Sequence, residues 1–336
     1  MQQAKYSIIL PVYNGGEYVK VCVNSILSQS IPEFELLVLD NCSTDGTVEW
    51  LRSLLDNRIR IIVADRPLSI EENWGRIKSV DKHEFITLIG HDDTLEPDYL
   101  AILDQLIHQY PNASLYQTHF NYIDSHGESI RKCKPMPAEE RADEFLKSSL
   151  TNAFDIMGTG FMMRSADYDA LGGIPNYPNL MFADLELWYR LTAIGFKATA
   201  AATGFSFRIH QSTTKTTADD KLQLAFERAV FFLDSLKQED KLSAKVINDQ
   251  GITFIHHYCR SLSHRLIRTP LKNRNGLTVG GFINKCKSYA DRLVPGNSYN
   301  PLADKAVRLA KYIDASPLSR FLFLYFRKIY SKPVYK

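Results

Sequence analysis

Apolar runs of strand length alternate with helix-like stretches over residues 1–110. Four of these runs read as buried strands: Tyr6–Tyr13, Phe34–Leu39, Arg58–Val63 and Phe85–Ile89. A helical stretch follows each run, so the pattern predicts a parallel sheet with right-handed crossovers. The carboxyl ends of such strands meet at one edge, where ligands bind in open α/β folds. We therefore expect the residues at the strand exits to lie along that edge: Tyr13, Asp40, Asp65 and Asp92.

The fourth run ends in an acidic turn, which we define as Gly90, His91, Asp92 and Asp93. Two carboxylates at a strand exit are hard oxygen donors that suit Mg²⁺ or Mn²⁺ holding a phosphate. The same residues also have the form of a cap for a helix that begins near Pro97. The residues of the turn, taken alone, leave both interpretations open.

Polar residues also follow the first two strands. Asn14, with Glu17 three positions later, has the form of a helix start. Asp40 could cap a helix in the same way, or accept a hydrogen bond from a nucleoside ring N–H or a ribose hydroxyl. The chain has neither a G-x-G-x-x-G nor a G-x-x-x-x-G-K-S/T motif, so the sequence does not support a dehydrogenase-type or P-loop phosphate site. A metal on the acidic turn is the simplest remaining way to hold phosphates.

Two stretches within residues 111–216 carry candidate chemistry. Met157–Arg164 is an apolar, strand-like run whose glycines permit close backbone approach, and a plain core strand is the alternative. Asp184 stands at the start of a helical period with an apolar face. The helix macrodipole there favours the ionised carboxylate, and simple capping is again the alternative. Glu186 and Arg190 lie four residues apart, which predicts a structural ion pair on another face.

The joint spacing of several motifs resembles glycosyltransferase family 2, the inverting nucleotide-sugar transferases of the GT-A fold. The motifs are Ser7–Asn14, Glu35–Thr47, and His91-Asp92-Asp93 followed by Pro97. With the later segments around Asp184 and His210, they cover about the first two-thirds of the chain. The resemblance implies an α/β fold with a Rossmann-like, mostly parallel sheet flanked by helices, and a helical C-terminal extension.

The resemblance also implies a division of the chain. Residues 1–216 would form the catalytic domain, with 1–110 as its nucleotide-binding half and 111–216 as its acceptor and catalytic half. Residues 217–336 would form a helical, basic C-terminal region.

Site roles follow from the same resemblance. Asp92 matches the metal-binding carboxylate and Asp184 the catalytic base. His210 matches a second metal ligand or phosphate contact, although a lone histidine at a strand end is more often a surface residue. Ser212 would belong to a lid, and Asp93 and Gly158 are further candidates. The residues matched to nucleotide-sugar contacts are Pro11, Tyr13, Asn14, Asp40, Asp65, Asn73, His91, Asp92 and Arg208.

Two positions depart from the family pattern. Gly90 stands where the first Asp of an Asp-x-Asp-Asp run is expected, and Ala183 stands where Glu precedes the base. Asp92 is retained, so metal binding through this residue is still expected. His91 is the candidate for part of the role that the first Asp plays.

Composition and charge change the picture mainly for the end of the chain. The 336 residues, 45% of them hydrophobic, can bury a sizeable core, and their net charge is +2. Residues 257–336, however, hold 16 Lys and Arg against three Asp. Helical periods predict helices over Lys221–Leu236, Leu242–Leu266 and Asp304–Ile313, before a mixed aromatic and basic end, Phe321–Tyr330.

This basic region has two interpretations. It packs on the catalytic domain with a solvated face, or it lies on an anionic membrane surface. Nucleic-acid binding is disfavoured, since no recognised module accompanies the charge. The five scattered cysteines favour a reducing compartment, and neither a signal peptide nor a run of transmembrane length is expected.

These observations together predict a cytoplasmic, metal-dependent inverting glycosyltransferase, peripheral on the inner membrane, that uses Mn²⁺ or Mg²⁺. It would transfer a sugar from a nucleotide-diphosphate donor, a UDP-sugar in the first instance, to a saccharide on undecaprenyl diphosphate during bacterial surface-polysaccharide synthesis. One alternative is a non-catalytic binding subunit of similar fold. Another is a sugar-phosphate nucleotidyltransferase, which would carry a Gly-rich, Arg-containing loop where this chain has Tyr13-Asn14-Gly15-Gly16.

Overall fold

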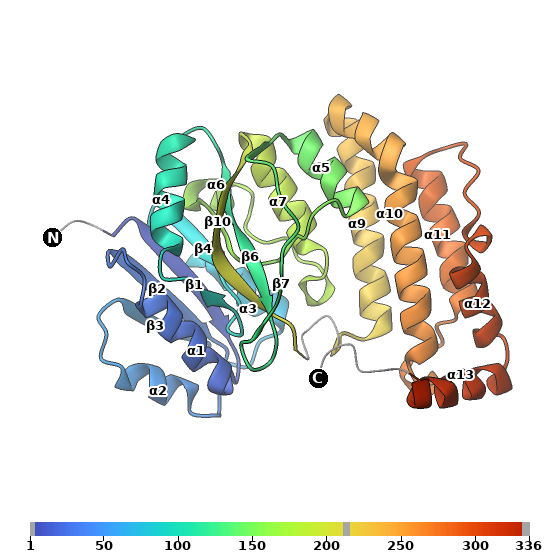
Figure 1. The fold of residues 1–336 in the computed structure, drawn as a ribbon, viewed down its shortest axis with the longest axis horizontal. Coiled ribbons are helices and arrows are strands. Elements are labelled where there is room, and N and C mark those ends of the chain that lie inside the picture. The colour runs from blue at the N-terminus through green and yellow to red at the C-terminus, as the bar shows by residue number, and fades with distance from the viewer. Residues whose placement is uncertain (1–3, 211–215, 331–336) are drawn as a thin grey trace. The chain divides into compact units, whose positions relative to one another are not determined.

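The structure, a computed structural model, describes residues 4–210 and 216–330. Contacts divide the chain into two compact units. The first comprises Met1–Phe145 with Ala153–Ser212, and the second Leu146–Asn152 with Thr213–Lys336. The first unit is α/β, whereas helices make up the second (Figure 1).

Ten strands of the first unit form one sheet within the described residues. Their order is β3-β2-β1-β4-β9-β6-β10-β5, with β7 beside β6 and β8 beside β10. The strands are β1 (Tyr6–Val12), β2 (Phe34–Asp40), β3 (Ile59–Val63), β4 (Phe85–Leu88), β5 (Thr94–Leu95), β6 (Leu115–Ile123), β7 (Ser129–Lys132), β8 (Glu139–Glu140), β9 (Phe161–Arg164) and β10 (Lys197–Arg208).

The first four strands confirm the predicted parallel arrangement. β1 pairs in parallel with β2 and β4, and β2 pairs in parallel with β3. Every residue of β1 is buried, which explains why its sequence reads as a continuous apolar run rather than an alternating one. β4 then pairs antiparallel with β9, and β6 pairs in parallel with β10. The expected α/β sheet with a helical C-terminal region is therefore observed.

Helices surround this sheet in Figure 1. α4 packs on β6 and β10, and α7 packs on β6. The helices associated with the first unit are α1 (Gly16–Leu27), α2 (Thr47–Ser53), α3 (Ile70–Gly75), α4 (Tyr99–Gln109), α6 (Ser165–Ala170) and α7 (Ala183–Ile194), with the 3₁₀ helices η1 (Arg76–Ser79) and η2 (Pro178–Leu180). α5 (Ala142–Thr151) crosses the boundary between the units.

The strand expected over Met157–Arg164 is shorter than predicted. β9 contains only its last four residues, and Met157–Gly160 is a loop. Gly160 has a positive φ of 78°, and a Cβ there would lie 2.8 Å from the ring of Phe205. The glycine spacing thus marks a tightly packed loop instead of a strand.

The second unit is helical. Its helices are α9 (Asp219–Glu239), α10 (Lys241–Arg268), α11 (Val279–Leu293), α12 (Lys305–Asp314) and α13 (Pro317–Tyr330), with η3 (Leu271–Asn273) and η4 (Pro301–Ala303). α10 packs against α9, α11 and α12, so it is the central helix of this unit (Figure 1). The predicted helices within this unit are confirmed, whereas α11 was not predicted. Among the residues the structure describes, none of the helices is both long and apolar enough to span a bilayer.

Candidate active site

Hydrogen bonds connect the loops that follow β1 and β2. Asn14 has a positive φ of 48°, its N–H donates to Ser43 Oγ (2.9 Å), and its side-chain oxygen accepts from the N–H of Thr44 (2.8 Å). The N–H of Gly16 donates to Asp45 (2.9 Å). The prediction that Asn14 starts the helix was wrong: α1 begins at Gly16, without a side-chain cap. Asn14 instead fixes the two loops against each other.

Asp40 lies at the end of β2 and is fully buried. Its Oδ2 accepts from the N–H of Ser43 (3.0 Å), whereas its Oδ1 is buried without a hydrogen-bond partner in the described structure. A buried carboxylate oxygen with no donor is costly, because burial removes the water that would otherwise solvate it. Asp40 therefore presents an acceptor that is suited to a ligand's N–H or O–H donor.

Neighbouring side chains hold the backbone around Asp40. Asn73 is buried, and its amide donates to the carbonyl of Leu39 (3.2 Å) and accepts from Arg76 (2.9 Å). Arg76 also donates to the carbonyl of Asp40 (2.9 Å). Asp65 is exposed at the end of β3 and contributes a charge that acts on Arg76. The structure thus places Asn73 as a support for the strand exit and Asp65 on the surface.

Asp93 is the buried member of the acidic turn. Thr159 Oγ1 donates to its Oδ2 (2.9 Å), and the backbone N–H of Arg208 donates to its Oδ1 (3.0 Å). Burial, together with the charge of Asp92, raises the pKa of Asp93 well above its usual value. Two hydrogen bonds therefore hold the Asp93 carboxyl in the interior of the fold. Neither it nor Asp92 caps the following helix, because β5 intervenes and α4 begins only at Tyr99.

Asp92 meets His210 across the site. His210 Nε2 lies 2.5 Å from Asp92 Oδ2, and the two side chains are 19% and 25% exposed. Burial pushes the pKa of Asp92 upward, but the hydrogen bond to His210 and the charges of His91 and His210 outweigh it, so that pKa falls below its usual value. His91 is half-buried beside this pair, and burial lowers its pKa. The pair joins two residues that are far apart in the chain.

Tyr18 and Arg208 support the pair. The ring of Tyr18 lies 5.1 Å from the imidazole of His210, and the Arg208 guanidinium lies 4.8 Å from the same tyrosine ring. Arg208 is buried and donates to the carbonyls of Asp92 (2.7 Å) and Asp124 (2.9 Å). The structure thus uses Arg208 to hold the acidic turn in place beneath the site.

Gly90 leaves room for the carboxylates of the turn. A Cβ at this position would lie 2.7 Å from Asp92 Oδ1 and 3.1 Å from Asp93 Oδ2. The first distance is shorter than real Cβ contacts, so any side chain here would displace Asp92. The departure from the family pattern therefore matches the observed position of the Asp92 carboxylate.

We expect Gly90→Ala to reduce Mn²⁺ affinity about 10-fold, a loss typical of changes next to a metal ligand. Mn²⁺ titration by calorimetry would measure this. Gly75→Ala is the matched control, because nothing lies within 4 Å of a Cβ at Gly75. Equal Mn²⁺ affinities in the two variants would contradict the explanation.

Asp184 lies in the first turn of α7 and is half-buried. Its Oδ1 accepts from the N–H of Leu185 (3.0 Å), and no charged group of the described structure contributes to its pKa. Burial raises the pKa of Asp184 above its usual value. That the helix macrodipole keeps this carboxyl ionised stays a prediction. Loss of solvent disfavours the charged form and is the largest effect on this pKa.

The loop Met157–Gly160 connects Asp184 with the acidic turn. Trp188 Nε1, on α7, donates to the carbonyl of Met157 (2.9 Å), and a Cβ on Gly158 would lie 4.0 Å from Asp184 Cβ. The next residue, Thr159, donates to Asp93. Successive residues of one short loop thus touch both the candidate base and the turn.

The remaining predicted residues have varied positions. Glu186 and Arg190 form the predicted ion pair (2.9 Å). Pro11 is buried in β1, whereas Tyr13 is exposed just after it. Ser212 lies outside the described residues. Sequence reasoning did not identify Tyr18 or Thr159 as site residues, and only the Gly-Thr-Gly context of Thr159 offered a signal.

Residues 7–172 match the family described as Glycosyl transferase family 2. The chain belongs to this family. It is a glycosyltransferase with a GT-A fold, and the family uses nucleotide-sugar donors.

Curated relatives are similar over part of the chain. It is 27% identical over 201 residues to the putative teichuronic acid biosynthesis glycosyltransferase TuaG of Bacillus subtilis, covering 57% of this chain and 73% of TuaG. It is 28% identical to glycosyltransferase GlyG of Streptococcus pneumoniae, covering 36% of this chain and 41% of GlyG. It is 30% identical to chondroitin synthase of Pasteurella multocida, covering 44% of this chain but only 15% of that protein.

Solved structures share the fold at low identity. The S. aureus TarS fragment 1–349 in complex with UDP-GlcNAc has a TM-score of 0.63 at 15% identity, covering 97% of this chain and 91% of that one. Mannosyltransferase PcManGT from Pyrobaculum calidifontis, in complex with GDP-Man and Mn²⁺, has a TM-score of 0.50 at 12% identity, covering 98% and 89%.

Proposed function

We propose that this glycosyltransferase is metal-dependent and inverting, and that it transfers a sugar from a UDP-sugar to a saccharide hydroxyl. The observation that carries the proposal is the contact between Asp92 and His210, which lies one short loop away from Asp184. The reaction needs ligands for a cation and a carboxylate that acts as a base, and these residue types can supply both.

Asp92 and His210 fit a site for Mn²⁺ or Mg²⁺. Among residues 4–210 and 216–330, no group of three or more Asp, Glu, His or Cys side chains could enclose a metal. Two protein ligands nevertheless suit these ions, which commonly keep waters and take further oxygens from substrate phosphates. A bound divalent cation would supply the charge that stabilises a departing diphosphate. The mannosyltransferase PcManGT, which contains GDP-Man and Mn²⁺, supports this assignment by analogy.

Asp184 is the proposed base. Its carboxylate takes the proton of the acceptor hydroxyl while that oxygen bonds to the anomeric carbon of the sugar. The bond from this carbon to the diphosphate oxygen breaks on the opposite side, and its electron pair leaves with the nucleoside diphosphate. One displacement inverts the configuration, so no covalent intermediate is required. The raised pKa of Asp184 supports the role, because it makes the carboxylate a stronger base.

Asp40 supports recognition of a base with a ring N–H, because its buried Oδ1 lacks a donor. Uracil presents such an N–H, whereas cytosine and adenine do not at the equivalent edge. A thermal-shift panel of nucleoside diphosphates with Mn²⁺ should therefore show larger stabilisation by UDP than by CDP or ADP. Equal shifts across the panel would contradict the donor assignment.

Asp40→Asn provides the sharper test. The amide can both donate and accept, so we expect UDP affinity to fall about 10-fold, the cost of one charge-assisted hydrogen bond, and the preference over CDP to disappear. Calorimetry with each nucleotide measures both effects. Asp65→Asn is the control with an exposed carboxylate at the next strand exit. An unchanged preference for UDP in Asp40→Asn would remove Asp40 from base recognition.

The proposed acceptor is a lipid-linked saccharide of bacterial surface polysaccharide. TuaG, whose name refers to teichuronic acid biosynthesis, and chondroitin synthase support a polysaccharide product. Association with the cytoplasmic face of the membrane belongs to the same proposal. α13 supports it, because large apolar side chains are exposed on this helix: Leu318, Phe321, Leu322, Tyr325 and Phe326. Pelleting with anionic but not neutral vesicles would test the association, and pelleting with neither would contradict it.

Gly90 and Ala183 favour one second candidate, a binding subunit without activity. Hydrolysis of a UDP-sugar in the presence of Mn²⁺ separates the two, since a binding subunit would hydrolyse none.

A further inference from the structure

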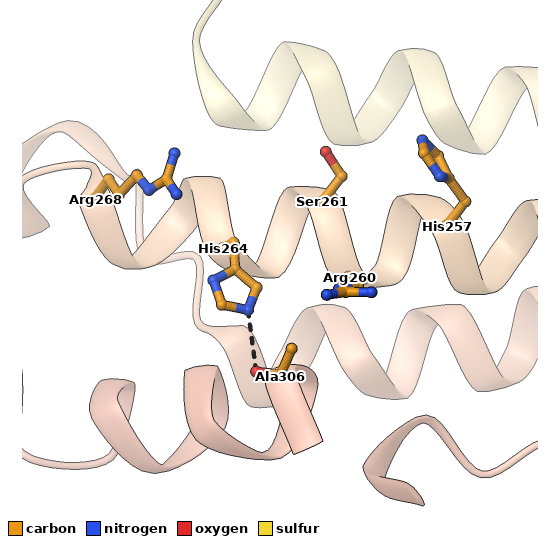
Figure 2. Close-up of a pocket in the computed structure, with 6 residues that line it drawn as sticks. All are labelled: His257, Arg260, Ser261, His264, Arg268 and Ala306. Carbon is orange, nitrogen blue, oxygen red and sulfur yellow. Dashed lines mark hydrogen bonds between the residues drawn. The ribbon is translucent and has the colours of Figure 1, made fainter. Parts of the chain in front are cut away.

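A pocket of about 450 Å³ lies on α10 in the second unit. It is lined by His257, Arg260, Ser261, His264 and Arg268 of α10 and by Ala306 of α12. His257, Ser261, His264 and Arg268 recur every three or four positions, and Arg260 adjoins Ser261, so the five residues lie on successive turns along one side of the helix (Figure 2). The volume is within the range of small-molecule sites.

The lining is made of hydrogen-bond donors. Two guanidinium groups, two imidazoles and one hydroxyl line the pocket, without a carboxylate among the lining residues. His264 Nε2 bonds to the carbonyl of Ala306 (3.1 Å), which fixes the orientation of the ring (Figure 2). Ala306 contributes its methyl group and the carbonyl that bonds to His264, so the polar side chains that can reach a ligand all belong to α10.

The positive charges of this pocket are only partly compensated. Arg260 Nε lies 4.0 Å from Asp304 Oδ2, but that carboxylate also accepts from the Ala306 N–H (2.6 Å) and contacts His256 (3.0 Å). Arg268 has no acidic partner among the described residues.

Burial and neighbouring positive charge both lower the pKa of two lining residues. Partial burial, followed by the charge of Arg327, lowers the pKa of Arg268. Partial burial, followed by the charges of His256 and Arg260, lowers the pKa of His257. Both shifts disfavour the protonated form, and a bound anion would oppose them.

We propose that this pocket binds a phosphate or diphosphate group. Guanidinium forks match the paired oxygens of phosphate, and the hydroxyl of Ser261 and the imidazole of His257 supply further donors around them. A carboxylate has too few oxygens to accept hydrogen bonds from all of these donors. The site would be additional to the nucleotide site, and the inference does not depend on the proposed function. The phosphate belongs either to a soluble compound or to a lipid headgroup.

Calorimetric titration of the full chain with pyrophosphate, in EDTA so that metal-dependent binding is absent, tests the site. We expect Arg260→Gln with Arg268→Gln to weaken binding at least about 10-fold, because two charge-assisted contacts are lost. The control removes two positive charges from exposed positions of α11, Lys285→Gln with Arg292→Gln, and should change affinity less than about twofold. Both double variants should keep UDP-sugar hydrolysis with Mn²⁺.

Three results would overturn the proposal. They are a wild-type chain that does not bind pyrophosphate, equal losses in the two double variants, and unchanged binding in the pocket variant. Circular dichroism at matched temperature would show that the variants fold. If the folded pocket variant binds pyrophosphate as the wild type does, the site is refuted whatever the catalytic assays show.

Vesicles distinguish the source of the phosphate. With a headgroup as ligand, vesicles containing phosphatidic acid should bind the wild type more tightly than the pocket variant, and pyrophosphate should displace them. With a soluble ligand, pyrophosphate should bind through the two arginines without displacing vesicles. Either result supports the phosphate site.

Discussion

Asp184→Asn should lower kcat for glycosyl transfer by about 10²- to 10⁴-fold, the usual contribution of a general base. The amide keeps the shape of the side chain but cannot take the proton of the acceptor hydroxyl. UDP affinity should stay within about threefold, because the loss concerns the transition state rather than ground-state binding. Transfer kinetics with a donor and acceptor pair, together with UDP calorimetry, would measure the two effects separately.

Stability offers an independent check on Asp184. Its pKa is raised in the folded protein, so its contribution to stability is fully present below the unfolded-state pKa and is lost as pH rises through the folded-state pKa. The ionised carboxylate therefore destabilises the fold at neutral pH. We expect Asp184→Asn to raise Tm at pH 7 by up to about 4 °C although it lowers kcat.

The control for this variant lies on the same helix. Glu186→Gln makes the same chemical change two residues away, where the side chain bonds to Arg190 and Tyr177. It should keep most of the transfer rate. A large loss of UDP affinity in Asp184→Asn, or equal losses of kcat in the two variants, would remove Asp184 from the role of base.

Local patterns predicted the first half of the sheet well. Buried parallel strands are mostly apolar on both faces, so β1 and β2 contain long hydrophobic runs that stop at polar residues. The chain direction then places the polar residues that follow these strands at the same edge of the sheet. Such features depend on neighbours in sequence, which is why periodicity was sufficient to find them.

Local reasoning failed where a distant part of the chain competes for the same group. Asn14 has the form of a helix start, but the N–H of Thr44 uses its side-chain oxygen. The place of Asp184 in the first turn of α7 gave no sign that burial would raise its pKa. In both cases the tertiary surroundings, which the local sequence does not show, decide the outcome.

The pairing of Asp92 with His210 lies between these two cases. The types of both residues indicated chemistry, and the family resemblance assigned them a shared ligand, but neither periodicity nor spacing brings them together. The contact forms because the end of β10 reaches the acidic turn, where the backbone N–H of Arg208 bonds to Asp93. Its support by Tyr18 of α1 could not be predicted from the sequence for the same reason.

Asp92→Asn should abolish the gain in UDP affinity that Mn²⁺ provides, and lower transfer at least about 100-fold. Changes to the outer shell of a metal site already cost 10- to 100-fold, so loss of a charged ligand should cost no less. Asparagine retains an oxygen but not the negative charge that opposes the cation. UDP titrations in Mn²⁺ and in EDTA should give the same affinity for this variant and different affinities for the wild type.

Asp98→Asn provides the matched control, because Asp98 is exposed, lies six residues further along the chain and makes no side-chain cap to α4. It should keep both the Mn²⁺ effect and transfer. If Asp92→Asn keeps the Mn²⁺ effect, the cation is held elsewhere and the contact between Asp92 and His210 is an ordinary structural pair. If Mn²⁺ has no effect on the wild type either, the reaction needs another source of positive charge beside the diphosphate. Since Arg208 is buried and donates to the carbonyls of Asp92 and Asp124, that source would have to be a different residue.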